Sequence, residues 1–149
     1  MIVPWTPQPS PDNVKPATWR VRLAVKLQSP MGPPHSVFFH ATADTGALWT
    51  TFTDDYARIA GVRDIESGRP TKVRWFGLDL DGWQHRVSWS LATNQKQSET
   101  ITFDPMDVLF IHRFAHPRSG KPVSLAVLGM DWLAHLCVTL DGPAAVTRF

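Results

Sequence analysis

The chain has 149 residues, of which 43% are hydrophobic and 19% are charged, a composition typical of one globular domain and not of a disordered segment. Its net charge is +2 and its Lys and Arg residues are scattered, which argues against a nucleic-acid partner, and no apolar stretch is long enough to span a membrane. Thirteen prolines and nine glycines favour a β-rich fold with many turns.

The only cysteine, Cys137, lies in an apolar stretch near the C-terminus. A disulfide within the chain is therefore impossible, and the first residues lack the charged and apolar regions of a secretory signal. We expect a cytoplasmic protein in which Cys137 is a small buried side chain. Seven Trp residues against one Tyr favour a packed β core over a ligand groove.

The first third of the chain predicts an arm and two strands. Residues 1–16 contain five prolines, which predicts an extended Pro-rich arm outside any packed element and leaves 17–149 as the domain. Residues 17–28 alternate between apolar and mostly basic side chains, as a half-exposed strand does. A second strand over 36–43 leads directly into Asp44 and the turn that follows it.

A short helix is predicted after this turn. Thr53 is a suitable N-cap, and Asp54 and Asp55 favour the positive end of the helix dipole. Gly61 suits the left-handed position that ends a helix. The helix should therefore cover 55–60.

The strongest hairpin signal covers residues 71–92. Asp81-Gly82 is a candidate for a type I′ turn, but Gly77 can instead mark the tip. The two alternatives give different strand registers, and the sequence leaves the register open.

The last third predicts further strands and a second short helix. Residues 101–114 hold a strand, and the continuous apolar run 122–129 is typical of a strand that is buried on both faces. Gly129 ends this run, and Asp131 can cap a short helix over 132–136. One or two strands follow to the C-terminus.

The Asp44-Thr45-Gly46-Ala47 turn is the candidate functional motif. Amide hydrolysis by carboxylates needs a base that takes a proton from water and an acid that protonates the carbonyl oxygen, and two adjacent Asp side chains that share one proton supply both. The N–H of Gly46 can orient the Asp44 carboxylate, and the small Ala47 leaves room beside a cleft. The tripeptide alone is more often an ordinary turn, but the strands, helix and hairpin around it favour the functional interpretation.

This order of elements, with residues 38–50 at the front and 126–133 at the back, resembles the retropepsin-like aspartic proteases, a single-lobe family of retroviral, retroelement and some bacterial enzymes. The resemblance covers roughly 17–145. It implies an all-β fold, with a closed acid-protease β-barrel and one or two short helices. It also implies a homodimeric aspartic endopeptidase that hydrolyses a peptide or protein substrate with no metal and no cofactor.

Residue by residue, the resemblance makes Asp44 the catalytic carboxylate, Thr45 the source of hydrogen bonds across the two-fold axis, and Gly46 a part of the same catalytic loop. The hairpin takes the place of the flap that covers the cleft. The implied substrate-binding residues are Ala47, Trp75, Phe76, Gly77, Val127 and Leu128, the last two packing with Gly129 beneath the loop.

Two departures stand out. Retroviral members carry Arg after the glycine that corresponds to Gly129, whereas this chain has Met130, so the ion pair made by that Arg is absent or replaced; Asp131 still matches. The hairpin carries Trp75, Phe76 and Trp83 and is heavier than a glycine-rich flap.

A single motif supplies a single carboxylate, so the second Asp44 must come from another copy of the chain, related by a two-fold axis. The resemblance points to the chain ends as the dimer strands. The prolines make the N-terminal arm a poor sheet partner, so we expect the C-terminal strand to contribute more. The alternative from another class is a catalytically silent module of the same fold that dimerises or binds peptides.

Two other chemistries are less well supported. His112 and His116 are four residues apart and His40 precedes the motif, but the local pattern indicates strand and loop and not the helix on which such spacing binds metal. No serine lies in a nucleophile-elbow motif, although composition alone does not exclude a Ser-His-Asp triad. No metal site is predicted.

Overall fold

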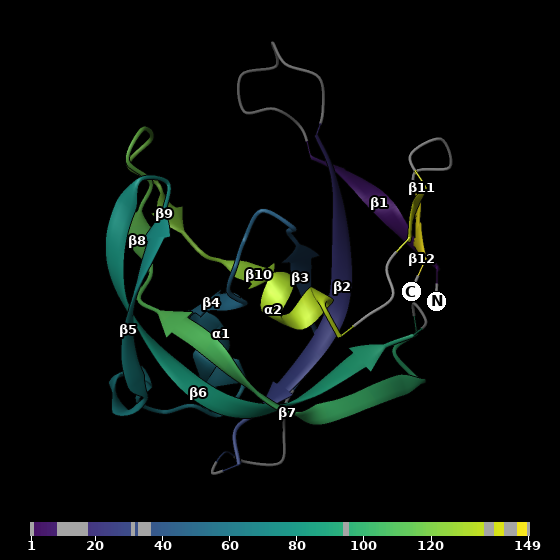
Figure 1. The fold of residues 1–149 in the computed structure, drawn as a ribbon, viewed down its shortest axis with the longest axis horizontal. Helices are drawn as coiled ribbons and strands as arrows, with labels where there is room; N and C mark the ends of the chain where they lie inside the picture. Colours follow the sequence, from purple (N-terminus) through teal and green to yellow (C-terminus); the bar gives the residue numbers. More distant parts are fainter. Residues whose placement is uncertain are drawn as a thin grey trace.

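The structure is a computed structural model that describes residues 2–8, 18–30, 32, 37–93, 96–135, 139–141 and 146–148. These residues are mostly β-sheet, with two short α-helices and one 3₁₀ turn, so the predicted all-β class is confirmed (Figure 1). The strands are β1 (Ile2–Gln8), β2 (Thr18–Gln28), β3 (Phe39–Ala43), β4 (Thr51–Thr53), β5 (Arg69–Trp75), β6 (Leu78–Ala92), β7 (Thr100–Ile111), β8 (Phe114–Ala115), β9 (Pro122–Val123), β10 (Ala126–Leu128), β11 (Thr139–Asp141) and β12 (Val146–Arg148). The helices are α1 (Asp54–Ile59), the 3₁₀ turn η1 (Ile65–Ser67) and α2 (Met130–Leu133).

Six strands close into a barrel. They follow the order β2-β3-β10-β4-β7-β6, and β6 pairs again with β2 to close the ring. Strand β10 lies between β3, to which it is parallel, and β4, to which it is antiparallel. Strands β1, β12 and β11 extend the sheet from β2, and β5 extends it from β6, so that β11 and β5 are the two ends of the strand order (Figure 1).

The period-two pattern of the second strand places one face in the core. Leu23, Val25 and Leu27 are at most 1% exposed, whereas Arg22, on the opposite face of the strand, is exposed. Large aromatic side chains fill the barrel, and the rings of Trp89 and Trp132 stack with their centroids 5.4 Å apart. The prediction that tryptophans build a β core is therefore confirmed for this pair.

The prediction that residues 1–16 take no part in a packed element is wrong for the first part of the segment. Residues 5–8 pair antiparallel with β2, and residues 2–4 pair with β12. Proline lacks the N–H of other residues, but it has no effect on the ladder where that N–H would point away from the partner strand. The two chain ends therefore lie side by side in one sheet (Figure 1).

The hairpin tip lies at Phe76 and Gly77, so the alternative turn at Asp81-Gly82 is wrong. Phe76 and Gly77 have φ angles of 51° and 81°, as a two-residue turn of type I′ requires. Gly82 lies inside β6, and a Cβ atom there would come within 2.8 Å of the Leu109 side chain. Close packing, and not a turn, accounts for this glycine.

The first helix agrees with the sequence, and the second begins earlier than expected. Helix α1 follows Thr53, although the Thr53 hydroxyl bonds to the Asp55 side chain and does not cap a backbone N–H of the helix, and Gly61 has a φ of 81°. The N-cap of α2 is Gly129 and not Asp131, which lies in the first turn. The predicted continuous strand over 122–129 is two strands, β9 and β10, and among the described strands β9 pairs with β8 alone. Cys137 lies outside the described residues.

None of the helices in the described part of the chain is long and apolar enough to cross a membrane.

Candidate active site

Asp44 follows β3 directly and begins a tight loop. The N–H of Gly46 donates to Oδ1 of Asp44 at 2.9 Å, and the N–H of Ala47 donates to the Asp44 carbonyl at 3.2 Å. The predicted orientation of the carboxylate by the Gly46 N–H is therefore confirmed. Thr45 is exposed at the turn, and its hydroxyl makes no hydrogen bond within the described part of the chain.

The loop is anchored to the segment that follows β10. The N–H of Asp44 donates to the carbonyl of Leu128 at 3.0 Å. On the far side of the loop, the N–H of Met130 donates to Ala47 at 2.8 Å and the N–H of Asp131 donates to Leu48 at 3.2 Å. Backbone bonds on both sides of the turn therefore hold the carboxylate in place.

The buried Thr50 and the carboxylate of Asp131 lock the end of the loop. The Thr50 N–H donates to both Asp131 oxygens, at 2.8 and 2.9 Å, and the Thr50 hydroxyl donates to Oδ1 at 2.7 Å. The Thr50 hydroxyl oxygen in turn accepts from the N–H of Gly129 at 3.0 Å. Asp131 thus fixes the loop through hydrogen bonds, and no arginine at position 130 is needed for this contact.

Gly129 is required by close approach and not by a special backbone angle. Its φ of −87° is accessible to any residue. A Cβ atom at this position would lie 2.5 Å from the carbonyl carbon of Trp49 and 2.8 Å from the backbone nitrogen of Thr50. The segment 128–131, which we term the return segment, can therefore pack this closely against the Asp44 loop only with glycine at position 129.

A cleft of about 430 Å³ separates the Asp44 loop from the hairpin. Of the site residues predicted from the sequence, Asp44, Gly46, Ala47 and Trp75 line it. Val127 and Leu128 are 7% and 0% exposed and support the loop from beneath. The further lining residues, which sequence reasoning missed, are Leu48, Trp49, Thr51, Lys72, Val73 and Arg74.

The hairpin faces the cleft with a strand edge. Trp75 pairs with Leu78 around the two-residue turn, which makes them a hydrogen-bonded pair. Because hydrogen-bonded and non-bonded pairs alternate, the backbone N–H and C=O groups of Lys72 and Arg74 point away from β6. Strand β5 ends the sheet order, so these groups have no strand partner in the described sheet.

The side chains of these two residues are tied to β6. The guanidinium of Arg74 contacts both carboxylate oxygens of Asp79, at 2.7 and 2.9 Å, and Lys72 pairs with Asp81. Hydrogen bonding to Arg74 lowers the pKa of Asp79. These pairs are on the exposed surface and contribute little to stability, because solvent screens them.

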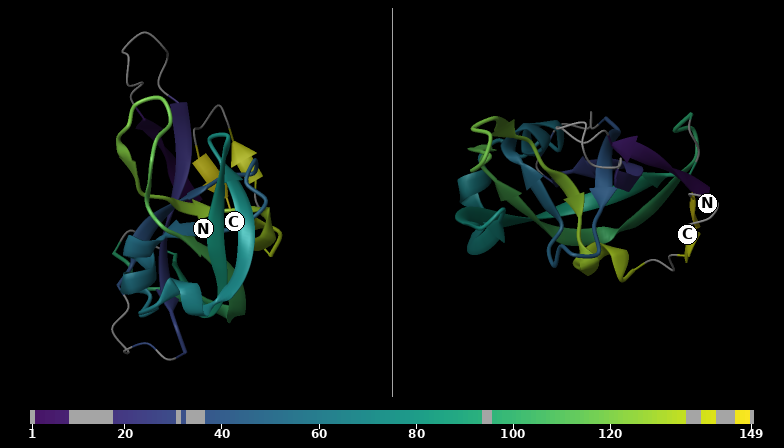
Figure 2. Two further views of the ribbon diagram at one scale, coloured as in Figure 1. Left: turned by 90° about the vertical axis from the view of Figure 1, so that its left-hand side faces the viewer. Right: turned by 90° about the horizontal axis from the view of Figure 1, so that it is seen from above.

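The tip of the hairpin packs on the β8–β9 hairpin, which lies beside it in the left view of Figure 2. The ring of Phe76 lies 6.2 Å from that of Phe114 and 4.9 Å from that of His116, measured between centroids. Val73 and Trp75, on the inner face of β5, pack against a second apolar cluster that also contains Ala47. Phe76 and Gly77 thus form the tip and do not line the cleft.

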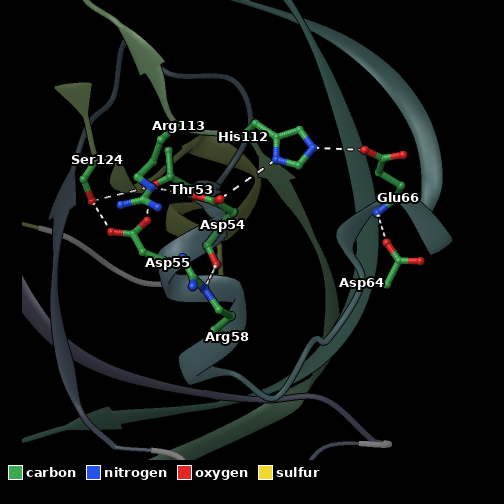
Figure 3. Close-up of polar contacts among 9 residues, drawn as sticks. All are labelled: Thr53, Asp54, Asp55, Arg58, Asp64, Glu66, His112, Arg113 and Ser124. Atoms are coloured by element: carbon green, nitrogen blue, oxygen red, sulfur yellow. Dashed lines mark hydrogen bonds and ion pairs between the residues drawn. The ribbon is translucent and has the colours of Figure 1, made fainter. Parts of the chain in front are cut away.

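A polar cluster lies at the start of α1 (Figure 3). The Asp55 carboxylate accepts hydrogen bonds from the hydroxyls of Thr53 and Ser124, both at 2.5 Å. Burial alone would raise the pKa of Asp55, but these hydrogen bonds, a backbone hydrogen bond and the charge of Arg113 outweigh burial and hold the pKa below its usual value.

The lowered pKa of Asp55 predicts acid-sensitive stability. At about pH 7, Asp55→Asn should reduce the free energy of unfolding by about 1–2 kcal/mol, because charged hydrogen bonds are lost. A carboxyl with a lowered folded-state pKa stabilises the fold above its unfolded pKa, near 4, and this stabilisation is lost as the pH falls through the folded value. Urea unfolding from about pH 7 down to about pH 2 measures the difference.

Asp104→Asn is the matched control, because Asp104 is exposed and makes no hydrogen bond among the described residues. The difference between wild type and Asp55→Asn should shrink on acidification, and the difference for Asp104→Asn should stay near zero. A difference for Asp55→Asn that stays constant or grows in acid would show that the Asp55 charge does not stabilise the fold.

The two histidines considered as metal ligands have different neighbours. His112 lies 3.1 Å from Glu66 and 3.9 Å from Asp54 (Figure 3). His116 instead packs on the ring of Phe76. Within the described ranges, no group of three or more His, Cys, Asp or Glu side chains is placed to hold a metal ion.

Comparison with known protein families and with characterised proteins gives no match to this chain.

Proposed function

We propose that this chain is a homodimeric aspartic endopeptidase of the retropepsin-like family. The observation that carries the proposal is the setting of Asp44. Its carboxylate borders a cleft of about 430 Å³, is oriented by the N–H of Gly46, and belongs to a loop that is anchored to the 128–131 segment. A simple surface turn does not need this anchoring.

The proposed chemistry uses one Asp44 from each of two copies. One carboxylate is ionised and takes a proton from water as the water oxygen attacks the peptide carbonyl carbon. The other is protonated and gives its proton to the carbonyl oxygen. Collapse of the tetrahedral intermediate then breaks the C–N bond, and the leaving amine receives a proton from the carboxyl pair. A single Asp44 cannot be ionised and protonated at the same time, so the reaction requires the pair.

The cleft suits an extended peptide. The backbone groups of Lys72 and Arg74 that point away from β6 can pair with a substrate strand, which positions the scissile bond by main-chain hydrogen bonds. Leu48, Trp49 and Trp75 line the same cleft with apolar surface. The β5–β6 hairpin then acts as the flap that covers the bound strand.

The proposal is tested by incubating the protein with a mixture of peptides at mildly acidic pH and identifying products by mass spectrometry. We expect cleavage that pepstatin or a retroviral protease inhibitor blocks and that a metal chelator leaves unchanged. If a folded dimer leaves all peptides intact across the acidic and neutral range, the chain is a catalytically silent module and not an enzyme.

A further inference from the structure

The β5–β6 hairpin ends in an arm that no third strand supports. Strand β6 pairs with β7 from Gly82 onward, whereas among the described strands residues 78–81 pair only with β5. A two-stranded hairpin on its own is marginally stable in water. Residues 72–81, which we term the arm, therefore depend on side-chain contacts with the rest of the chain to keep one position.

The residue at the tip of the arm makes such a contact. The ring of Phe76 packs on the rings of Phe114 and His116, at centroid distances of 6.2 and 4.9 Å. Phe76 has a φ of 51°, which a bulky side chain rarely adopts and for which a turn of this type prefers Asn or Gly. The turn itself thus disfavours phenylalanine, and the aromatic contact offsets this cost.

The β8–β9 hairpin, on which Phe76 packs, is held at both ends by the first turn of α1 (Figure 3). Arg113, directly before β8, donates from Nε to Oδ1 of Asp54 at 3.0 Å. The hydroxyl of Ser124, directly after β9, donates to Asp55 at 2.5 Å. The contact of Phe76 therefore joins a weakly supported arm to a firmly held element.

The arm is also the wall of the cleft that has to move for a peptide to enter. Val73 and Trp75 of the arm pack on the apolar cluster that contains Ala47, close to Asp44. The cleft of about 430 Å³ is near the lower end of the range of about 300–1,000 Å³ for pockets that hold one small molecule. An extended peptide of several residues needs a wider space. Because backbone hydrogen bonds hold the Asp44 loop on both sides, the arm is the wall that can yield.

We propose that the contact of Phe76 with Phe114 and His116 is a latch that holds the arm against the cleft, and that its release admits substrate. The ring of Phe76 stays 52% exposed, so the contact buries little surface and can open and close reversibly. The latch is a property of one chain. The substrate that it admits, an extended peptide, rests on the proposed function.

The distance between the arm and the β8–β9 loop tests the latch directly. Spin labels are attached at Asp79→Cys and Arg118→Cys, with Cys137→Ser to leave no other thiol. An excess of unlabelled chain ensures that pulsed electron paramagnetic resonance measures distances within one chain. The wild-type contact should give one narrow distance distribution. Phe76→Asn should widen it about twofold or more, towards longer distances, because asparagine suits the tip and keeps the turn while the ring is lost.

Further variants separate a latch from a general loss of structure. Phe114→Ala should widen the distribution as Phe76→Asn does, and the double variant should add little, because both substitutions break the same contact. Phe76→Tyr keeps the ring and should keep the narrow distribution. Ile101→Asn is the matched control, because Ile101 is 48% exposed on β7, outside the arm, and its loss should change nothing. Thermal unfolding checks that each variant is folded.

The association of pepstatin, followed by stopped-flow tryptophan fluorescence, connects the latch to the cleft. Phe76→Asn should raise the association rate constant about twofold to tenfold, because the loss of one or two aromatic contacts makes the open arm more frequent by such a factor. Phe76→Tyr and Ile101→Asn should associate at the wild-type rate.

The outcomes separate the two proposals. A distance distribution that is already broad in the wild type, or that Phe76→Asn leaves narrow, would overturn the latch, as would an unchanged association rate in Phe76→Asn. Peptide cleavage by the wild type would still support the proposed function in each of these cases. If the distances respond as expected but the wild type neither binds pepstatin nor cleaves any peptide, the contact holds the arm without admitting substrate, and the assignment as an endopeptidase fails.

Discussion

Replacing Asp44 by asparagine is expected to reduce peptide cleavage by more than about a hundredfold. In a homodimer the substitution removes both carboxylates at once, so that neither a base for water nor an acid for the carbonyl oxygen remains. Asparagine has nearly the same shape, and its side-chain oxygen can still accept the hydrogen bond from Gly46. The loop should therefore stay folded while kcat/KM collapses, measured with the peptide that the wild type cleaves best.

Asp107→Asn is the control for this experiment. Asp107 is an exposed carboxylate on β7 that contacts Arg86 at 3.5 Å, and it does not line the cleft. We expect its cleavage rate to equal that of the wild type. Cleavage by Asp44→Asn at the wild-type rate would remove Asp44 from the mechanism and with it the assignment as an aspartic endopeptidase.

Replacing Gly129 by alanine is expected to lower the free energy of unfolding by about 2–4 kcal/mol, the largest stability effect that we predict. The added Cβ would lie 2.5 to 2.8 Å from backbone atoms of Trp49 and Thr50, which cannot rotate away as a side chain can. The return segment must shift, which disturbs the hydrogen bonds of Thr50 to Gly129 and Asp131. Because the same segment anchors Asp44, cleavage should fall together with stability.

Gly77→Ala is the comparison that separates steric overlap from backbone strain. Gly77 has a φ of 81°, and a Cβ atom there would meet no atom within 4 Å. Its replacement should cost about 1 kcal/mol from strain alone. Equal or smaller destabilisation by Gly129→Ala, measured by denaturant unfolding, would show that the close approach of the two segments does not constrain position 129.

Local patterns predicted the local structure well. The alternation over 17–28 predicts β2, and Thr53 together with Gly61 predicts the limits of α1, because these signals depend only on neighbouring residues. The pairing of β1 with β2 and β12 could not be predicted, because it depends on a distant strand that accepts a proline-containing partner. The turn at Asp81-Gly82 was one of two alternatives that the sequence allowed, and it is wrong because Gly82 is needed for packing against Leu109.

The same division holds for the candidate site. The motif itself predicted Asp44, Gly46 and the hydrogen bond between them. The opposite wall of the cleft was predicted only at Trp75, because the contributions of Lys72 and Arg74 depend on the hairpin register, which the sequence left open. With the tip placed at Gly77, the alternation of hydrogen-bonded and non-bonded pairs along β5 would have identified Lys72 and Arg74 as the residues whose backbone groups point away from β6.

The apolar residues next to the motif are a further feature of the sequence. Leu48 and Trp49 continue the motif, and Met130 was noted only as a departure from the arginine of retroviral members. All three side chains are exposed in the structure, and backbone hydrogen bonds join the two segments that carry them. Separation in sequence, about eighty residues, is what hid the connection.

Mixing wild-type protein with Asp44→Asn tests most directly whether two copies form one active site. When subunits have exchanged in an equal mixture, random pairing makes about one quarter of the dimers wild type on both sides. If both carboxylates are required, the mixture should show about one quarter of the activity of the same total amount of wild type. Activity of about one half, in direct proportion to the wild-type fraction, would mean that each chain acts alone and would contradict the account.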